Sequence, residues 1–465
     1  MIHVKNFSSK NNINIFNIIK IFKPDEDIIF TDDFTKKGLF IECIYKDTSS
    51  TVKLFKDGSL LDENTKDNSN FNYSKIKLTI NNLYEVLSNY YNYKSDYGTL
   101  TGIRPVKLVR KYLGKGLEPE EIKNELETKY LLKTDKINQL IDIASRERGL
   151  IDSSKTSLYI NIPFCPSKCS YCNFVSFISK DKDIDTYMEY LLKDLEENLN
   201  LINKYSLEVE SIYIGGGTPS ILSVSHMERL LKFCSDNIKC FKEFTFEAGR
   251  TDTLNKEKIK LLKKYNVTRI SINPQSLNQK TLDRLNRKQD LNEFNKYFEI
   301  CKEENILINS DLIIGLPGEN VEDMKYTLDE LIKLKPDNIT IHTLAIKNQS
   351  NIKFNENIIP DRDLEKAYNY SYNRLLEEGY KPYYLYRQKN ILGNLDNIGY
   401  SLKNKESLYN INIIEETQNI ISAGLGSVSK IIRNNKVHRI PYNKSLKDYC
   451  HKYNYVNLNK EKYLK

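Results

Sequence analysis

The chain has 465 residues and a formal net charge of +8, and it contains no tryptophan. This length allows about two or three domains with sizeable cores, and no uninterrupted apolar run is long enough to cross a membrane. The first residues mix Asn, Ser and Lys with short apolar pairs and lack the apolar core of a signal peptide, so we expect a cytoplasmic protein. Because the basic residues form no single stripe, we expect neither a nucleic-acid nor a membrane partner.

The first 150 residues indicate an α+β domain. Short strands are predicted at 28–30, 39–45 and 51–55, with a turn at 56–58 and helices at about 75–93, 118–131 and 134–147. Between two of these helices, residues 98–105 form a loop punctuated by Gly and Pro that carries Arg104. The simpler interpretation is an ordinary turn between helices, and the sequence gives residues 1–150 no predicted role.

Residues 151–350 alternate between strand and helix patterns. The predicted strands are 158–162, 209–214, 243–246, 267–272, 306–314 and 338–342. The clearest helix has one apolar face, made of Ile184, Tyr187, Leu191, Leu195, Leu199 and Ile202. This succession predicts an α/β fold with a parallel sheet covered by helices, either an open doubly wound sheet or a partial (β/α)6 barrel. In both architectures, ligands bind beyond the carboxyl ends of the strands.

Residues 351–465 carry a different pattern and predict a C-terminal α+β extension. A helix is predicted near 361–378, followed by aromatic or glycine-rich segments at 383–390, 393–400 and 423–430. We interpret these segments as loops that build or cover the mouth of the barrel and enclose a substrate.

Three cysteines follow the first strand of the middle region with C-x3-C-x2-C spacing: Cys165, Cys169 and Cys172. A structural zinc site normally has four ligands in two separated pairs, so this trio fits zinc poorly. A [4Fe–4S] cluster is usually held by four cysteines, and three would leave one iron open to a small chelating molecule. Zinc binding and a chance group of thiols are the alternatives. The other five cysteines show no disulfide spacing.

Other distinctive residues also fall at predicted carboxyl ends of strands. The string Gly215-Gly216-Gly217-Thr218-Pro219 follows the second strand and lets the backbone approach a ligand closely, although a tight turn would look similar. Glu247 closes the third strand. Its carboxylate could accept hydrogen bonds from a ribose or an ammonium group, or could pair with Arg250 or another cation.

The later strands add further candidates. Gln275 follows the fourth strand and Arg287 stands twelve residues later; a loop cap and a solvated helix charge are the simpler interpretations. Asp311 lies within the apolar fifth strand, where it could bind backbone amides or a nucleoside sugar. His342 ends the sixth strand and suits a buried core position as well as a functional one, and Ala345 lies just beyond that strand.

These motifs, in this order, resemble the radical SAM superfamily, in which the open iron binds the amine and carboxylate of S-adenosylmethionine. Within it the chain resembles the oxygen-independent coproporphyrinogen III dehydrogenases (oxidases), in particular the HemZ-like branch of Bacilli and Clostridia. The likeness runs through residues 100–105, 340–347, 385–390 and 414–418 and therefore covers nearly the whole chain.

The resemblance implies specific ligand contacts. It implies one [4Fe–4S] cluster held by Cys165, Cys169 and Cys172. It implies contacts with a first S-adenosylmethionine from Tyr159, Tyr171, Gly216 and Glu247. It implies contacts with a second S-adenosylmethionine from Gly217, Thr218, Gln275, Arg287, Asp311 and Ala345.

The resemblance also implies a reaction. Reductive cleavage of S-adenosylmethionine gives a 5′-deoxyadenosyl radical, which removes a β-hydrogen from a propionate of coproporphyrinogen III. Loss of CO2 and one electron leaves a vinyl group, and a second round gives protoporphyrinogen IX. This tetrapyrrole is strongly anionic, and Arg387, Lys389 and Arg104 are the candidates to bind its carboxylates. We expect a monomer that receives electrons from flavodoxin with its reductase or from ferredoxin.

One departure and two rival interpretations accompany this resemblance. The best-studied members carry a further cysteine two residues after the third ligand, where this chain has Phe174. Related haem chaperones keep the cluster motif but transfer haem, and they typically carry a His-Asn-x-x-Tyr-Trp segment. This chain has no tryptophan and has Arg387-Gln388-Lys389-Asn390 in the comparable region. A radical SAM enzyme acting on RNA would add a nucleic-acid module, and none is evident. We therefore favour the coproporphyrinogen enzyme.

Overall fold

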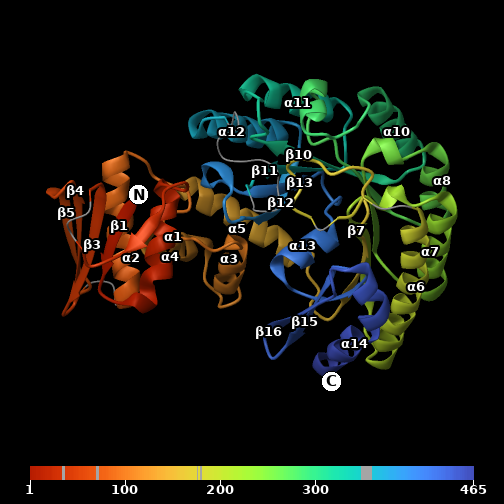
Figure 1. Ribbon diagram of the computed structural model, residues 1–465, viewed down its shortest axis with the longest axis horizontal. Helices are drawn as coiled ribbons and strands as arrows, with labels where there is room; N and C mark the ends of the chain where they lie inside the picture. Colours follow the sequence, from red (N-terminus) through yellow and green to blue (C-terminus); the bar gives the residue numbers. More distant parts are fainter. Residues whose placement is uncertain (34–36, 70–72, 175, 179–180, 347–358) are drawn as a thin grey trace. The chain divides into compact units, whose positions relative to one another are not determined.

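The computed structural model describes residues 1–33, 37–69, 73–174, 176–178, 181–346 and 359–465 (Figure 1). The chain divides into two compact units, Met1–Ala144 and Ser145–Lys465. Lys347, which ends the string 340–347, and residues 351–358 of the C-terminal region lie outside the described ranges. No helix within those ranges is both long and apolar enough to cross a bilayer.

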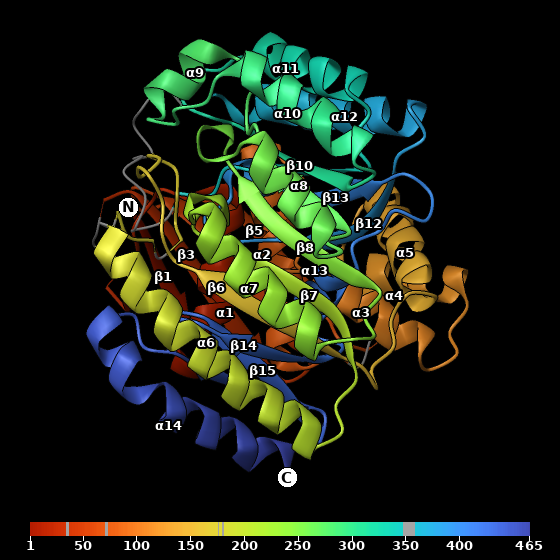
Figure 2. The ribbon, with the colours of Figure 1, turned by 90° about the vertical axis from the view of Figure 1, so that its right-hand side faces the viewer.

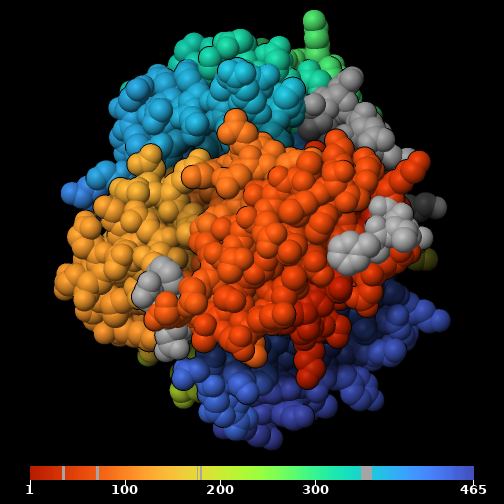
Figure 3. Space-filling view, turned by 90° about the vertical axis from the view of Figure 1, so that its left-hand side faces the viewer, coloured from red at the N-terminus to blue at the C-terminus, as the bar shows by residue number. Residues whose placement is uncertain are grey.

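The described residues of the first unit, red to orange in Figure 3, include a five-stranded sheet with the order β2-β1-β3-β4-β5. β1 pairs in parallel with β2 and β3, whereas β3, β4 and β5 are antiparallel. The strands are β1 (Ile2–Asn6), β2 (Ile28–Phe30), β3 (Leu39–Lys46), β4 (Ser49–Lys56) and β5 (Ser59–Asp67). The helices are α1 (Asn12–Phe22), α2 (Lys75–Tyr91), α3 (Pro105–Leu113), α4 (Pro119–Tyr130) and α5 (Thr134–Arg148), the last of which crosses the boundary between the units.

One face of this sheet forms the core of the first unit. In β4, Val52 and Leu54 are fully buried and pack in one cluster with side chains of α1 and α2. Ser74 begins α2 by accepting a hydrogen bond from the Lys77 backbone N–H, and Asn92 ends it in the left-handed conformation. The predicted strands are present as β2, β3 and β4 and the predicted helices as α2, α4 and α5, while β1, β5, α1 and α3 are additional.

The described residues of the second unit include an eleven-stranded sheet with the order β12-β13-β11-β10-β9-β8-β7-β6-β14-β15-β16. β6 to β11 are neighbours in chain order, and each pairs in parallel with the next. Helices α6, α7 and α8 lie side by side over one face of these strands (Figure 2). Because the strand order never reverses, this is a partial (β/α)6 barrel rather than an open doubly wound sheet, and the predicted fold class is confirmed.

The elements of the second unit have the following bounds. The strands are β6 (Thr156–Ile162), β7 (Val209–Gly216), β8 (Glu243–Gly249), β9 (Arg269–Ile272), β10 (Leu307–Ile314), β11 (Asn338–Thr343), β12 (Lys381–Tyr386), β13 (Asn397–Ser401), β14 (Asn419–Ala423), β15 (Val428–Arg433) and β16 (Lys436–Pro441). The helices are α6 (Asp181–Lys204), α7 (Val224–Asn237), α8 (Lys256–Lys264), α9 (Gln279–Arg284), α10 (Leu291–Glu303), α11 (Val321–Lys333), α12 (Asp361–Glu377), α13 (Leu408–Glu415) and α14 (Leu446–Leu464).

The interpretation of the aromatic and glycine-rich C-terminal segments as loops is largely wrong. Residues 383–386 lie in β12, 397–400 in β13 and 428–430 in β15, which extend the sheet beyond its barrel strands at both edges. Tyrosines and isoleucines suit a pleated sheet, and the glycine serves packing rather than a turn. At Gly399 a Cβ would collide with the ring of Tyr384 on the neighbouring strand.

A buried polar network fastens the C-terminal helix α14 along α6 (Figure 2). Lys460 of α14 is fully buried, and its ammonium donates to Asn198 Oδ1 at 2.6 Å, the Ser422 carbonyl at 2.6 Å and Tyr442 Oη at 2.7 Å. Asp194 of α6, also fully buried, accepts from Tyr442 Oη at 2.6 Å and from the Gly424 N–H at 3.0 Å. The network thus connects two helices with the loop between β14 and β15.

Candidate active site

The carboxyl ends of β6 to β11 meet along one edge of the barrel, and the candidate residues lie there. The cysteine loop follows β6, Gly215 and Gly216 end β7, and Glu247 lies near the end of β8. Gln275 follows β9 and bonds to β10: its N–H donates to the Asp311 carbonyl at 2.9 Å, and its carbonyl accepts from the Ile313 N–H at 3.0 Å. Parallel pairing therefore brings together residues that are distant in sequence.

The cysteine loop is held by backbone hydrogen bonds. The Cys165 N–H donates to the Phe177 carbonyl at 3.0 Å, the Cys172 N–H to the Cys169 carbonyl at 3.1 Å, and the Ser170 N–H to the Leu285 carbonyl at 3.1 Å. Cys165 and Cys169 are buried and Cys172 is half-buried. Burial raises the pKa of the Cys165 thiol, although the Thr218 hydroxyl, which donates to its sulfur at 3.4 Å, opposes the shift.

The glycine string packs directly on this loop. The Gly217 N–H donates to the Ile162 carbonyl at 2.8 Å, and the Thr218 N–H donates to the Phe164 carbonyl at 2.8 Å. A Cβ on Gly217 would lie 2.6 Å from the Phe164 carbonyl oxygen and 2.9 Å from the Cys165 sulfur. Gly216 has φ +119°, a conformation that side chains rarely adopt. Glycine is therefore required at position 217 by the approach of the two loops and at position 216 by its backbone conformation.

We expect Gly217→Ala to lower the free energy of unfolding by about 1–3 kcal/mol and to reduce iron retention after reconstitution, because its methyl group displaces Cys165. Thermal unfolding and iron analysis measure the two effects. The matched control is Gly102→Ala, since a Cβ there meets nothing within 4 Å. An alanine at 217 as stable and as iron-rich as this control would contradict the packing argument.

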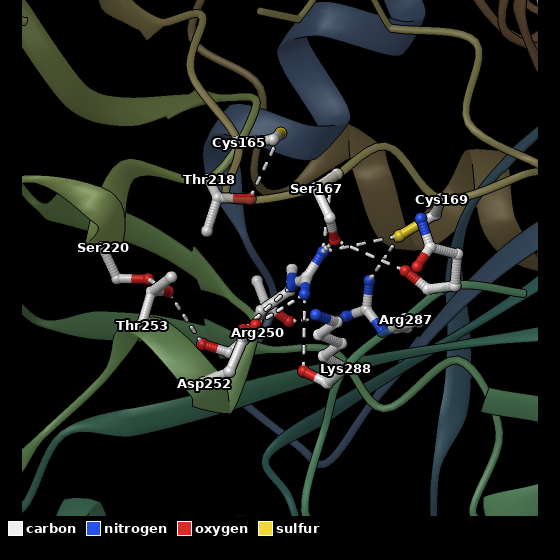
Figure 4. A network of polar contacts seen from close by, with 12 residues as sticks. Cys165, Ser167, Cys169, Thr218, Ser220, Arg250, Asp252, Thr253, Arg287 and Lys288 are labelled. Atoms are coloured by element: carbon white, nitrogen blue, oxygen red, sulfur yellow. Dashed lines mark hydrogen bonds and ion pairs between the residues drawn. The ribbon is translucent and has the colours of Figure 1, made fainter. Parts of the chain in front are cut away.

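A hydroxyl donor lies beside the Cys165 sulfur and two guanidinium groups lie beside the Cys169 sulfur (Figure 4). Arg250 Nη1 lies 3.7 Å and Arg287 Nη1 4.0 Å from the Cys169 sulfur. Soft thiolates are the ligands of iron–sulfur clusters, and donors around them suit an anionic cluster, so these residues fit such a group. Among the residues that the structure describes, no three or more His, Cys, Asp or Glu side chains converge to hold a single metal ion.

The carboxyl groups of Glu247 and Asp311 are close enough to interact electrostatically. Burial, together with the Asp311 carboxylate, raises the pKa of Glu247 to about 7, against the opposing hydrogen bonds from the Gly216 N–H and the Tyr213 hydroxyl. Arg250 makes its ion pair with Asp252, so the alternative pairing of Glu247 with Arg250 is wrong. The Glu247 carboxyl group is therefore not engaged by Arg250 and is available to a ligand in the barrel.

Asp311 makes side-chain contacts rather than only bonds to backbone amides. Its carboxylate accepts from Asn309 Nδ2 at 3.0 Å and lies 3.7 Å from His342 Nε2. Burial acts to raise the pKa of Asp311, but His342 and Asn309 outweigh it and the pKa is lowered. His342 Nδ1 in turn lies 3.3 Å from Tyr386 Oη, so His342 belongs to this polar cluster.

Arg287 is buried and reaches the cysteine loop, so its interpretation as a solvated helix charge is wrong. Its Nη1 donates to Tyr171 Oη at 3.0 Å and its Nη2 to the Gly249 carbonyl at 2.8 Å. Gln275 has φ +66°, and its buried Oε1 has no hydrogen-bond partner among the described residues. A polar atom held in this way is suited to receive a ligand donor.

Comparison with known proteins identifies the family. The model of the "Radical SAM superfamily" matches residues 159–331. The chain is 36% identical over 410 residues to the "Oxygen-independent coproporphyrinogen-III oxidase-like protein HemZ" of Bacillus subtilis, covering 84% of this chain and 82% of that protein. The chain belongs to this HemZ-like family of radical SAM proteins. Membership implies a [4Fe–4S] cluster and S-adenosylmethionine.

The chain is also similar to a haem chaperone and to a solved oxidase structure. It is 33% identical over 234 residues to a "Heme chaperone HemW" of Buchnera aphidicola, covering 49% of this chain and 61% of the chaperone. The solved "Coproporphyrinogen III oxidase (HemN) from Escherichia coli" matches with a TM-score of 0.54 and 19% identity, over 68% of this chain and 73% of HemN. That likeness shows the fold, which agrees with the partial barrel.

The candidate substrate residues of the HemZ-like chain lie in different places. Arg387 follows β12, is buried, and donates to the side chain of Asn394, while Lys389 is exposed. β12 runs parallel to β11 through the intervening antiparallel β13, so its carboxyl end reaches the same edge as the site. Ala345 is buried beyond β11, and its carbonyl accepts from Asn173 Nδ2 at 3.5 Å. Arg104 precedes α3 in the first unit, whereas the site lies in the second.

Several residues of the HemZ-like site were not predicted from the sequence. Asn161 of β6 accepts from Tyr159 Oη at 2.9 Å and donates to the Leu425 carbonyl at 2.6 Å; its signal was a polar residue inside an apolar strand. Tyr213 stacks on Tyr409 with ring centroids 4.3 Å apart. Tyr409 had no local signal, because α13 follows the barrel strands in sequence and reaches this position only through the tertiary fold.

Proposed function

We propose that this chain catalyses the oxygen-independent oxidative decarboxylation of coproporphyrinogen III to protoporphyrinogen IX. The observation that carries the proposal is the convergence of the cysteine loop, the glycine string and the Glu247–Asp311 pair at the carboxyl edge of one barrel. Similarity to HemZ over most of both chains supports the same reaction class. Each of two propionates loses a β-hydrogen atom, CO2 and one electron to become a vinyl group.

The residues have distinct roles in this proposal. Cys165, Cys169 and Cys172 hold one [4Fe–4S] cluster. A first S-adenosylmethionine contacts Tyr159, Tyr171, Gly216 and Glu247. A second one contacts Gly217, Thr218, Gln275, Arg287, Asp311 and Ala345. Together the bound groups supply a 5′-deoxyadenosyl radical, and the chain's part is to orient them and to exclude water.

Cationic side chains serve the anionic substrate in this proposal. Arg387, Lys389 and Arg104 are assigned to the propionates, since guanidinium groups bind carboxylates in pairs of hydrogen bonds. An Arg387→Ala variant with unchanged porphyrinogen affinity would remove that residue from the role. Phe174, where better-studied relatives have cysteine, is 72% exposed and lies two residues after the third ligand, so the proposed turnover has to proceed without a thiol at that position.

Glu247 gives S-adenosylmethionine binding a pH dependence. The group is protonated below its pKa of about 7, and only its carboxylate accepts hydrogen bonds freely. Affinity is therefore full above pH 7 and falls by up to about tenfold per unit as the pH drops below 7. Equilibrium dialysis of the cluster-loaded protein at pH 6 and pH 8 measures this change.

The matched control is Glu247→Gln, which keeps the shape but does not titrate. Because the ligand amine also titrates, the difference between the wild type and this variant isolates Glu247. Parallel pH profiles for the two proteins would contradict its role as a ligand acceptor.

The similarity to HemW favours a second candidate, a haem chaperone without decarboxylase activity. One experiment separates the two functions: anaerobic reconstitution with iron and sulfide, then incubation with coproporphyrinogen III, S-adenosylmethionine and a reductant. Vinyl products with 5′-deoxyadenosine are expected. Tight haem binding without decarboxylation would replace the enzyme by the chaperone. We propose that the protein is a monomer and that flavodoxin with its reductase, or ferredoxin, supplies its electrons. Either electron donor can replace the chemical reductant in the same assay.

A further inference from the structure

Arg250, just after β8, is a buried cation with its own carboxylate partner. Its side chain is 3% exposed. Its Nε donates to Asp252 Oδ1 at 2.9 Å and its Nη2 to Asp252 Oδ2 at 2.5 Å (Figure 4). One edge of the guanidinium is therefore fixed by a bidentate ion pair. Such a fork sets the plane and the direction of the group. Nη1 is left to point away from Asp252.

The other edge of the guanidinium holds the cysteine loop. Nη1 donates to Ser167 Oγ at 2.8 Å and lies 3.7 Å from the Cys169 sulfur, while Nη2 reaches the Lys288 carbonyl at 3.4 Å. Arg250 therefore joins three segments that are separate in sequence: the loop after β6, the end of β8 and the segment before α10. Ser167 and Cys169 are separated by one residue of that loop, so the single donor Nη1 contacts both.

We propose that Arg250, oriented by Asp252, is a positioning residue that clamps the cysteine loop and places a positive charge against the Cys169 sulfur. This inference rests on the proposed function, in which Cys169 is a cluster ligand. A cluster with three thiolate ligands is anionic and gains one more negative charge on reduction. A cation about 4 Å away in a water-poor site favours the reduced form. Arg250 therefore makes the cluster both better retained and easier to reduce.

Asp252 does not cancel this effect, because it binds the edge of the guanidinium opposite to Nη1. Arg287 is the other cation facing Cys169, with Nη1 at 4.0 Å. Arg287 also donates to Tyr171, to Gly249 and to Asn273, and among the described residues it forms no ion pair with a carboxylate, although Asp252 acts on it electrostatically. The two arginines can therefore be varied separately, and Arg250 is the one whose direction an acid sets.

The test compares Arg250→Gln and Arg250→Lys in the full chain, reconstituted without oxygen. The readouts are iron content, the midpoint potential of the cluster without substrate, and the unfolding temperature of the apo-protein. In Arg250→Gln we expect the ratio of reduced to oxidised cluster at a fixed potential to fall about tenfold, which is about 59 mV for one electron. Arg250→Lys keeps the charge but not the fork, so its midpoint stays near the wild-type value while its iron content falls.

Arg269→Gln is the matched control for a purely structural loss. Arg269 is equally buried, donates to Asn338 and to the Glu406 carbonyl, and lies at the amino end of β9, away from the cysteines. We expect this variant to unfold at a lower temperature with an unchanged midpoint. An Arg250→Gln protein with a wild-type midpoint, or one whose iron loss only follows its unfolding temperature as in the control, overturns the proposal.

The remaining outcomes of the experiment also support or overturn the proposal. If Arg250→Gln retains no cluster while its apo-protein unfolds as the wild type does, the clamp is supported, and the midpoint of Arg250→Lys then tests the charge. A tenfold shift in the lysine variant overturns the charge effect. A wild-type chain that binds no [4Fe–4S] cluster overturns the proposed function itself, before any arginine variant is compared.

Discussion

We expect Cys169→Ser to fold, to retain iron only at background level after reconstitution, and to form no 5′-deoxyadenosine. Cys169 is buried beside Arg250 and Arg287, and a hydroxyl there is a poor ligand for iron in a cluster. Since three thiolates are the whole protein ligand set in our proposal, no neighbouring residue replaces the lost one. Iron and sulfide analysis, electron paramagnetic resonance of the reduced protein and chromatography of the nucleoside products measure the three effects.

Two other cysteines provide matched controls for this experiment. Cys240 is exposed and Cys301 is buried, and neither belongs to the cysteine loop. Serine at either position should leave the iron content and the nucleoside product at wild-type levels. A Cys169→Ser protein that loads the same cluster as these controls, or a wild-type protein that holds zinc instead, would overturn the ligand assignment.

Local sequence patterns predicted most of the barrel. The strands β6 to β11 are short segments rich in β-branched and aromatic residues and separated by amphipathic helices, and this signal needs no knowledge of tertiary contacts. The candidate ligands were found because chain order and parallel pairing place every strand end at one edge. The pattern did not predict the C-terminal strands of the sheet, because a segment such as 397–400, with a glycine among apolar residues, fits a loop and a strand equally well.

Residues that act through tertiary contacts could not be found in this way. Arg250 stands three positions after Glu247, and the sequence left a pairing of these two opposite charges open as one alternative. The fold instead sends Arg250 to Asp252 and the cysteine loop, and leaves Glu247 within electrostatic reach of Asp311. Lys460 has Lys and Glu neighbours in sequence, which is typical of a solvated helix face. Only the packing of α14 on α6 makes it a buried group.

We expect Lys460→Met to lower the free energy of unfolding of the second unit by about 3 kcal/mol or more, because it removes one partner from a fully buried polar network. The substitution leaves Asn198 Oδ1, the Ser422 carbonyl and Asn457 Oδ1 without the donor that they share. Denaturant unfolding followed by circular dichroism measures the change. The control is Lys452→Met on the same helix, an exposed residue paired with Asp448, which should change stability by no more than about 0.5 kcal/mol.

The same network predicts how this difference depends on pH. Burial lowers the pKa of Lys460 to about 7, with Asp194 and Glu197 opposing the shift, whereas an unfolded lysine titrates near 10.4. Between about pH 7 and pH 10 the unfolded chain therefore binds one proton more than the folded chain, and the contribution of Lys460 to stability rises with pH. The gap between the wild type and Lys460→Met should widen across this window and stay flat below it. A constant gap from pH 6 to pH 10 would mean that the ammonium keeps its proton and that hydrogen bonding alone sets the loss.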